Sequence, residues 1–370
     1  MILSLNLMEE FKLKFYVIYL IFAVVAIIFS MYVDIKKKHY NSISAALALA
    51  LFSATAFLFG LRDLDVGADT DIVRVQFEFH DRIDFGFQFM FDFLIALVSQ
   101  FTDNYHIFLL VLSLLFNGLI FSSVLIFSRR IDLNIFLVSF SFVSFYFFEQ
   151  LGINIVRQGV SLAFFLLAVS LYFKNPSHYK LWIISMVFAV GFHITTVMVL
   201  LIFGLVILLK KLKTVYFYAL YFLVLIISAV GGSILSFGSL LSYFFLVDSQ
   251  RADFYINNEN GLGYEVGFKT QFAIFNTLFL GIFTFINSRI LKYEDESYEI
   301  LLKYYMVMSA VFFLMFQIPF SDRWGMMSWI TIPFLLAPLF SINRTARYSM
   351  GTLGFLFVIF VTFSMYYSSK

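Results

Sequence analysis

The class of fold follows from the stretch LWIISMVFAVGFHITTVMVLLIFGLVILL, residues 181–209. Its 29 residues include no Asp, Glu, Lys or Arg, whereas about 20 apolar residues in a helix suffice to cross a bilayer. Lys180 precedes the stretch and Lys210 follows it. One long helix would place these lysines on opposite sides of the membrane, against the positive-inside bias. We therefore expect two short helices that meet near residues 192–195 and expose His193 at an outer turn.

The composition of the whole chain agrees with a membrane location. Of 370 residues, 62% are hydrophobic and 13% are charged, compared with about 45–50% and roughly 25% in soluble domains. So few charges cannot cover the surface of a water-soluble globule. The net charge of +2 gives no reason to expect a nucleic-acid partner. The absence of cysteine excludes disulfides, thiol catalysis and cysteine-ligated metals.

The other apolar runs complete a prediction of an all-α, polytopic membrane protein. Together with the two halves of 181–209 they predict about 12 transmembrane helices, with both termini outside. These runs are 16–33, 43–61, 105–127, 133–148, 156–173, 215–235, 270–287, 304–320, 324–340 and 348–367. We expect residues 1–370 to form a single transmembrane domain.

Two acidic segments are predicted to lie on the outer side. The first outer loop, 62–104, contains the apolar run 85–101, whose Gln88 and Asp92 favour a re-entrant or interfacial helix over a full span. The second outer loop is 247–269. No His pair at helical spacing or other metal signature occurs, so we expect no metal and no cofactor.

Five basic side chains are predicted on the outer face, where the positive-inside bias works against them. They are Arg62, Arg157, Arg251, Arg323 and His193. Arginine suits bidentate contact with phosphate oxygens and stays charged at neutral pH. Polar residues placed against the energetic preference of the membrane are candidates for function. We therefore expect a substrate with one or two phosphates at headgroup depth.

A structural explanation is open for each of these residues. The arginines have carboxylates close by in sequence: Asp63 or Asp65 for Arg62, Asp253 for Arg251, and Asp322 for Arg323. A histidine at a helix end is often a structural or interfacial group. His193 would also suit a general base near neutral pH, or a hydrogen bond to a phosphate.

Four segments, taken together, resemble a known family. They are GLRDLDVGADTD (60–71), NIVRQGVSLAFFLLAVSLYF (154–173), VGFHITTVMVLL (190–201) and SDRWGMM (321–327). In this order they resemble the EpsG-like family of bacterial polysaccharide polymerases, related to the Wzy O-antigen polymerases, over about residues 55–340. The most specific part is Arg157-Gln158-Gly159, followed by an apolar helix and then by Phe192-His193.

The resemblance implies a multi-pass enzyme of the bacterial inner membrane, similar to the GT-C glycosyltransferases. Such polymerases join oligosaccharide repeat units carried on undecaprenyl diphosphate at the periplasmic face, without nucleotide sugar or ATP. The implied partners are this lipid-linked oligosaccharide, membrane lipids and a chain-length regulator.

The resemblance also implies roles for individual residues. Arg157 and Arg323 would bind the diphosphate and stabilise the charge that develops as it leaves. Arg62 and Arg251 would contact the diphosphate or the sugars. His193 would activate the acceptor hydroxyl or orient the diphosphate.

Four further residues complete the implied site. Gln158 and Asp322 lie beside the two diphosphate-binding arginines and would contact substrate. Asp69 and Asp71 are the alternative bases.

Two other functions remain open at this point. A ligase that transfers a finished glycan to another lipid acceptor would use similar groups. A transporter or flippase for an anionic substrate would need charges deep in the spans and two related halves. Here the basic groups are predicted at outer helix ends, and related halves are not evident.

Overall fold

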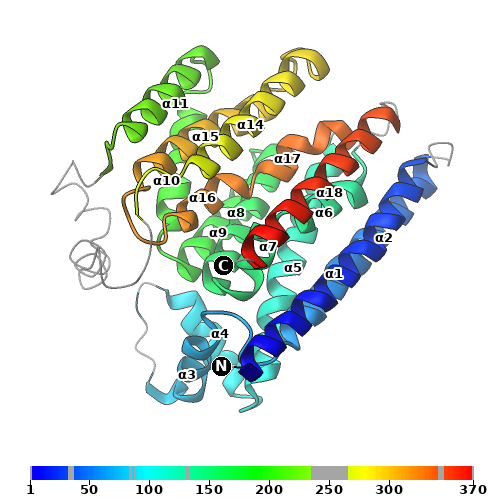
Figure 1. Ribbon diagram of the computed structural model, residues 1–370, viewed down its shortest axis with the longest axis vertical. Helices are drawn as coiled ribbons and strands as arrows, with labels where there is room; N and C mark the ends of the chain where they lie inside the picture. The colour runs from blue at the N-terminus through cyan, green and yellow to red at the C-terminus, as the bar shows by residue number, and fades with distance from the viewer. Residues whose placement is uncertain are drawn as a thin grey trace. The chain divides into compact units, whose positions relative to one another are not determined.

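The computed structural model describes residues 2–31, 37–82, 86, 88–130, 133–234, 266–340 and 346–368. Within these residues the structure consists of helices, with no β-sheet (Figure 1). The chain divides into two compact units. The first unit comprises Met1–Thr196 and Leu336–Lys370, and the second comprises Val197–Leu335.

The first unit is built around the long helix α8 (Val156–Lys174), which packs against α5 (Tyr105–Arg130) and α9 (Tyr179–Phe192). The helix α2 (Lys37–Gly60) packs on α5 in turn. The remaining helices are α1 (Ile2–Met31), α3 (Thr70–Glu78), α4 (Phe89–Ser99), α6 (Ile135–Val143), α7 (Tyr146–Ile153) and α18 (Ala346–Ser368), with 3-10 turns at His80–Arg82 and Ala337–Phe340.

The second unit is organised around α15 (Glu296–Leu314), which packs against α11 (Thr214–Ala229) and α16 (Asp322–Trp329). Its other helices are α10 (Thr196–Leu208), α14 (Thr270–Phe285) with a π-helical turn at Ile286–Ile290, and α17 (Ile332–Leu336). The buried Asn276 accepts hydrogen bonds from Ser309 Oγ at 2.9 Å and Trp329 Nε1 at 3.3 Å. These bonds join α14, α15 and α16.

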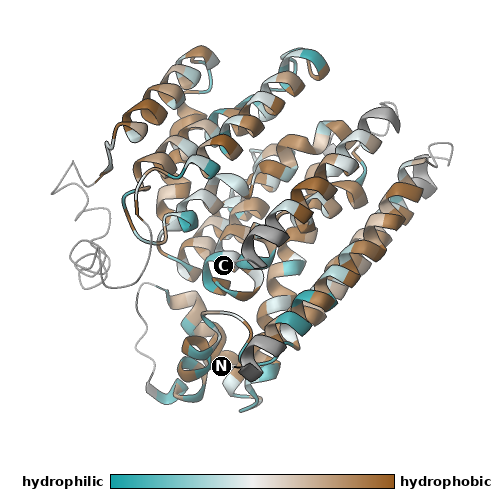
Figure 2. Ribbon diagram, viewed as in Figure 1, coloured by the Kyte–Doolittle hydropathy of each residue, from teal (hydrophilic) through white to brown (hydrophobic). Residues whose placement is uncertain are grey.

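Helix length and hydropathy identify a multi-pass membrane protein. Six of the described helices are long and apolar enough to cross a membrane, or seven if the bent pair α6–α7 counts as one span. Figure 2 shows the long helices coloured mainly as hydrophobic, with hydrophilic residues concentrated at helix ends and in loops. The prediction of about 12 spans is too high for these residues, because several apolar runs form helices of only 10–17 residues.

The stretch 181–209 divides as predicted. The helix α9 ends at Phe192 and α10 begins at Thr196, so the break falls at residues 193–195. The predicted interfacial segment 85–101 contains α4, which has 11 residues. A helix of that length extends about 16 Å, compared with about 30 Å for the hydrocarbon core. The helix α4 is therefore too short to span.

The predicted span 133–148 is not one continuous helix. This run forms α6 and the start of α7, and the two helices meet at an angle of 72°. The break lies at Ser144 and Phe145, where Phe145 adopts an extended conformation (φ −102°, ψ 136°). The helix α7 continues to Ile153, so Glu149 lies on a helix rather than in a loop.

The predicted span 324–340 is also interrupted. It forms α16, α17 and the 3-10 turn. Pro333 and Pro338 fall in the two short later elements, and proline cannot donate the backbone hydrogen bond that a continuous helix requires. The predicted second outer loop, 247–269, lies outside the described residues except for 266–269.

Candidate functional site

Arg62 ties the loop after α2 to the end of α7. Its side chain is 4% exposed. Nε donates to Val66 O at 3.0 Å and Nη1 donates to Phe59 O at 2.6 Å. Nη2 donates to Thr70 Oγ1 and to Ile153 O, both at 3.3 Å. Burial lowers the pKa of Arg62 to about 10, so the guanidinium stays protonated at neutral pH.

These contacts give Arg62 a structural role that does not involve a carboxylate. Within the described residues it forms no ion pair with Asp63 or Asp65, and backbone carbonyls accept its hydrogen bonds. Gly67 in the same loop has φ +103°, and a Cβ there would lie 2.4 Å from Ile153 O. Only glycine allows this close approach. A substrate contact by Arg62 stays a prediction.

Asp69 and Asp71 lie at the start of α3. Asp69 occupies the N-cap position and Asp71 the first turn. Acidic residues there stabilise a helix through its dipole. The Asp71 side chain is 67% exposed and forms an ion pair with Arg74 at 3.3 Å. Both carboxylates thus have a local structural explanation, and their role as bases stays a prediction.

Arg157 lies at the second position of α8. Nη1 donates a hydrogen bond to Gln88 Oε1 at 3.0 Å, and the guanidinium carbon lies 5.5 Å from the centroid of the Phe91 ring. A cation at a helix N-terminus opposes the helix dipole, so helix stability alone does not explain an arginine here. The adjacent Gln158 is 3% exposed.

His193 immediately follows α9 and occupies its C-cap. Its Nδ1 forms a hydrogen bond with Thr195 Oγ1 at 2.7 Å. The hydroxyl of Ser161 on α8 bonds to Ala189 O and to the Thr196 hydroxyl. These bonds attach the turn that carries His193 to the second turn of α8.

The start of α4 connects these two regions. A Cβ at Gly191, near the end of α9, would lie 2.3 Å from Met90 Cγ and 2.9 Å from Phe89 Cζ. The same turn of α4 begins with Gln88, the partner of Arg157. We call residues 88–91, Arg157 and residues 191–193 the α4 junction. It brings the guanidinium of Arg157 and the end of α9, which His193 caps, to the start of one short helix.

Arg323 belongs to the second unit, where it lies in the first turn of α16. Its guanidinium carbon is 4.9 Å from the centroid of the Phe320 ring. Phe320 has φ +58°, which turns the chain sharply before the helix. Within the described part of the chain, Asp322 Oδ1 is buried without a hydrogen-bond partner. Arg251, the remaining predicted arginine, lies outside the described residues.

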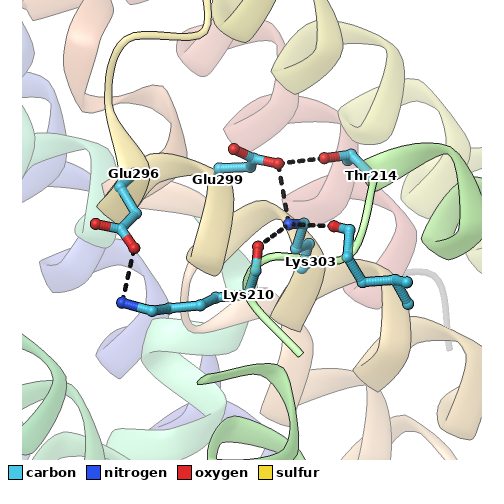
Figure 3. Close-up of polar contacts among 6 residues, drawn as sticks. Lys210, Thr214, Glu296, Glu299 and Lys303 are labelled. Atoms are coloured by element: carbon cyan, nitrogen blue, oxygen red, sulfur yellow. Dashed lines mark hydrogen bonds and ion pairs between the residues drawn. The ribbon is translucent and has the colours of Figure 1, made fainter. Parts of the chain in front are cut away.

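A network of buried polar contacts around Lys303 has a structural role in the second unit. Lys303 is 1% exposed, and its Nζ donates to Lys210 O at 2.7 Å and Leu212 O at 2.8 Å (Figure 3). It also pairs with Glu299 at 3.0 Å, and Glu299 accepts a hydrogen bond from Thr214. These contacts fasten the loop between α10 and α11 to α15.

A group of polar residues on and after α7 was not predicted from the sequence. Glu149 and Gln150, followed by Asn154, line a cavity of about 200 Å³. The signal was present, because Glu149 is the only charged residue between Asp132 and Arg157. The predicted span ends at Phe148, so Glu149 fell in a predicted loop. No group of three or more metal-ligating side chains occurs among the described residues.

The comparisons with known proteins identify the family. The model of the EpsG family matches residues 45–370, which include all four segments quoted above. No curated protein and no solved structure matches the chain. The matched region covers most of the chain and both units, which confirms the resemblance. This multi-pass membrane protein therefore belongs to the EpsG family, which is linked to exopolysaccharide biosynthesis.

Proposed function

We propose that this protein polymerises undecaprenyl-diphosphate-linked oligosaccharide repeat units at the periplasmic face of the bacterial inner membrane. Family membership supports a place in exopolysaccharide biosynthesis. The observation that carries the proposal is the α4 junction, where Arg157 bonds to Gln88 at the start of α4 and Gly191, two residues before His193, packs against Met90 and Phe89. This glycosyl transfer requires one group that binds an anion and one group that accepts a proton.

In the proposed reaction, a hydroxyl at the non-reducing end of one lipid-linked unit attacks the anomeric carbon of the growing chain. The new glycosidic bond forms as the bond between that carbon and the diphosphate oxygen breaks. Undecaprenyl diphosphate leaves with the bonding electron pair, and the hydroxyl proton passes to a base. No oxidant, nucleotide sugar or ATP enters this balance.

Arg157 would stabilise the negative charge that grows on the leaving diphosphate. The hydrogen bond to Gln88 and the contact with Phe91 hold the guanidinium in one orientation. Such preorganisation matters because fixed charges stabilise a transition state without the cost of reorganising. Gln158 would contact the same ligand.

His193 would accept the proton from the attacking hydroxyl. When Nδ1–H donates to Thr195 Oγ1, Nε2 carries the lone pair that accepts a proton. An imidazole is suited to this exchange near neutral pH. Asp69 and Asp71 are the alternative bases.

The other arginines enter the proposal through the family resemblance. Arg323, with Asp322 beside it, is assigned to the diphosphate. Its contact with Phe320 restrains the guanidinium. Arg251 and Arg62 are assigned to diphosphate or sugar contacts, and a chain-length regulator is proposed as a protein partner.

A deletion experiment tests this function. The gene is deleted, and the surface glycan is separated on a gel after complementation with wild type or with Arg157→Ala. The proposal predicts single capped repeat units in the deletion strain and in the variant, and a polymer ladder with wild type. Long polymer that is not attached to its acceptor would instead indicate a ligase.

A further inference from the structure

None of the residues assigned above lines a second feature of the first unit, a cavity beside α7. It encloses about 200 Å³ beside α7, and α1 and α18 contribute to its lining. Among the described residues, its polar lining comprises Lys12, Tyr16, Glu149, Gln150 and Asn154. The rings of Phe15, Phe145, Tyr146 and Phe360 also line it.

Glu149 is an unusual group to find on this helix. Its neighbours on α7 include Phe147, Phe148 and Leu151, all of which are buried. Within the described part of the chain, the Glu149 carboxylate has no hydrogen bond or ion pair. Lys12 is the charged group that interacts with it electrostatically. A carboxylate in apolar surroundings is costly unless it has partners, and such a residue in a membrane protein is a candidate for function.

The two amide side chains beside Glu149 are held in place. Asn154 Nδ2 donates to Gln150 Oε1 at 2.6 Å, and Ala68 N donates to Asn154 Oδ1 at 2.9 Å. The loop that contains Ala68 is the one that Arg62 ties to Ile153. Because Gln150 Oε1 is engaged, its Nε2 is the atom that can donate to a ligand. Among the described residues, no acceptor for Nε2 is present.

The charges of the cavity restrict the class of ligand. Glu149 disfavours an anion and Lys12 disfavours a cation, so the combination suits a neutral ligand with several hydrogen-bonding groups. A carboxylate, an ammonium and an amide supply both acceptors and donors for hydroxyls. Aromatic rings supply apolar surface for the C–H face of a sugar. The volume is below the range of about 300–1,000 Å³ for drug-sized ligands, which favours one ring.

We propose that this cavity binds one neutral sugar ring, with hydroxyl groups donating to the Glu149 carboxylate and accepting from Gln150. The proposal deepens the function proposed above, since it names where a sugar of the lipid-linked saccharide is held. Its test uses free sugars and needs neither the lipid carrier nor polymerisation. A failure of the sugar site is therefore distinguishable from a failure of the polymerase function.

The full chain is purified in a detergent without a sugar headgroup, and saturation-transfer NMR measures contact with methyl glycosides. The probes are methyl β-glucoside, methyl β-galactoside and methyl β-N-acetylglucosaminide, with cyclohexanol as a ring that lacks neighbouring hydroxyls. Glu149→Gln removes the charge and keeps the shape. Glu10→Gln is the matched control, because Glu10 is 56% exposed on α1, where it pairs with Lys14.

The proposal predicts saturation transfer to at least one glycoside with wild type and with Glu10→Gln. Loss of the charge-assisted hydrogen bond should weaken binding of that glycoside by about tenfold in Glu149→Gln. If this variant does not fold, Gln150→Leu carries the same expectation. Equal transfer in wild type and a folded cavity variant would overturn the proposal. So would the absence of transfer to every glycoside with wild type, or transfer to cyclohexanol as strong as to the glycosides.

Discussion

Arg157 on α8 and Gln88 before α4 are joined by a hydrogen bond of 3.0 Å from Nη1 to Oε1, across 69 positions of the sequence. This bond links the predicted first outer loop to the arginine proposed to bind the diphosphate. The segment predicted to be interfacial thus contributes a side chain to the α4 junction.

Arg157→Ala should abolish chain lengthening and leave the amount of protein in the membrane unchanged. Arg157→Lys should restore little activity, because an ammonium cannot reproduce the planar, bidentate contact with phosphate. Glycan chain length on a gel, with immunoblotting of membranes, measures both effects. Arg129→Ala is the control, since Arg129 is exposed at the end of α5. Full activity of Arg157→Ala would contradict the proposed role.

Gly191→Val should separate α9 from the start of α4. A Cβ at this position would lie 2.3 Å from Met90 Cγ, and forcing extra atoms into a packed contact costs about 1–3 kcal/mol. We expect a lower melting temperature and reduced chain lengthening, with partial rescue by Met90→Ala. Gly204→Ala is the control, because a Cβ there has no atom within 4 Å. A melting temperature equal to that of wild type would refute the close packing.

Arg62→Met should destabilise the first unit. The substitution leaves the carbonyls of Phe59 and Ile153 without the donor that Arg62 supplies, whereas Val66 O keeps the hydrogen bond from Thr70 Oγ1. Each unsatisfied buried group costs about 1–3 kcal/mol. Thermal unfolding in detergent should show a clearly lower midpoint. An unchanged midpoint with lost polymerisation would instead assign Arg62 to the substrate.

Lys303→Met should destabilise the second unit by roughly 2–4 kcal/mol, because it removes the cation that pairs with Glu299 and leaves the carbonyls of Lys210 and Leu212 without the donor that Lys303 supplies. The pair formed by Lys210 and Glu296 serves as the comparison (Figure 3). Their side chains are 38% and 67% exposed, so Lys210→Met should cost less than about 1 kcal/mol. Equal melting temperatures for the two variants would show that the buried network adds no stability.

The class of fold was predictable because it depends on composition and on runs of apolar residues. The break at residues 193–195 was also predictable, since lysines flank both ends of 181–209. The number of spans was not. The run 133–148 contains no charged residue, and its 72° bend depends on packing and on the conformation of Phe145, which hydropathy does not encode.

The candidate site was predictable only in its residue types. The motif Arg157-Gln158-Gly159 identified the start of α8, but its link to Gln88 required the fold. For Arg62 the alternative of a carboxylate partner, left open by the sequence, does not hold among the described residues, because nearby backbone carbonyls accept its hydrogen bonds. Glu149 was overlooked because the boundary of its helix was misplaced by several residues.

Reconstitution in liposomes tests directly whether the protein polymerises lipid-linked repeat units. Purified protein is placed in liposomes with undecaprenyl-diphosphate-linked repeat units, without nucleotide sugar or ATP, and the products are separated by size. We expect a ladder of longer lipid-linked glycans with wild type and none with Arg157→Ala. Movement of the lipid-linked saccharide across the bilayer without any increase in its length would contradict this expectation.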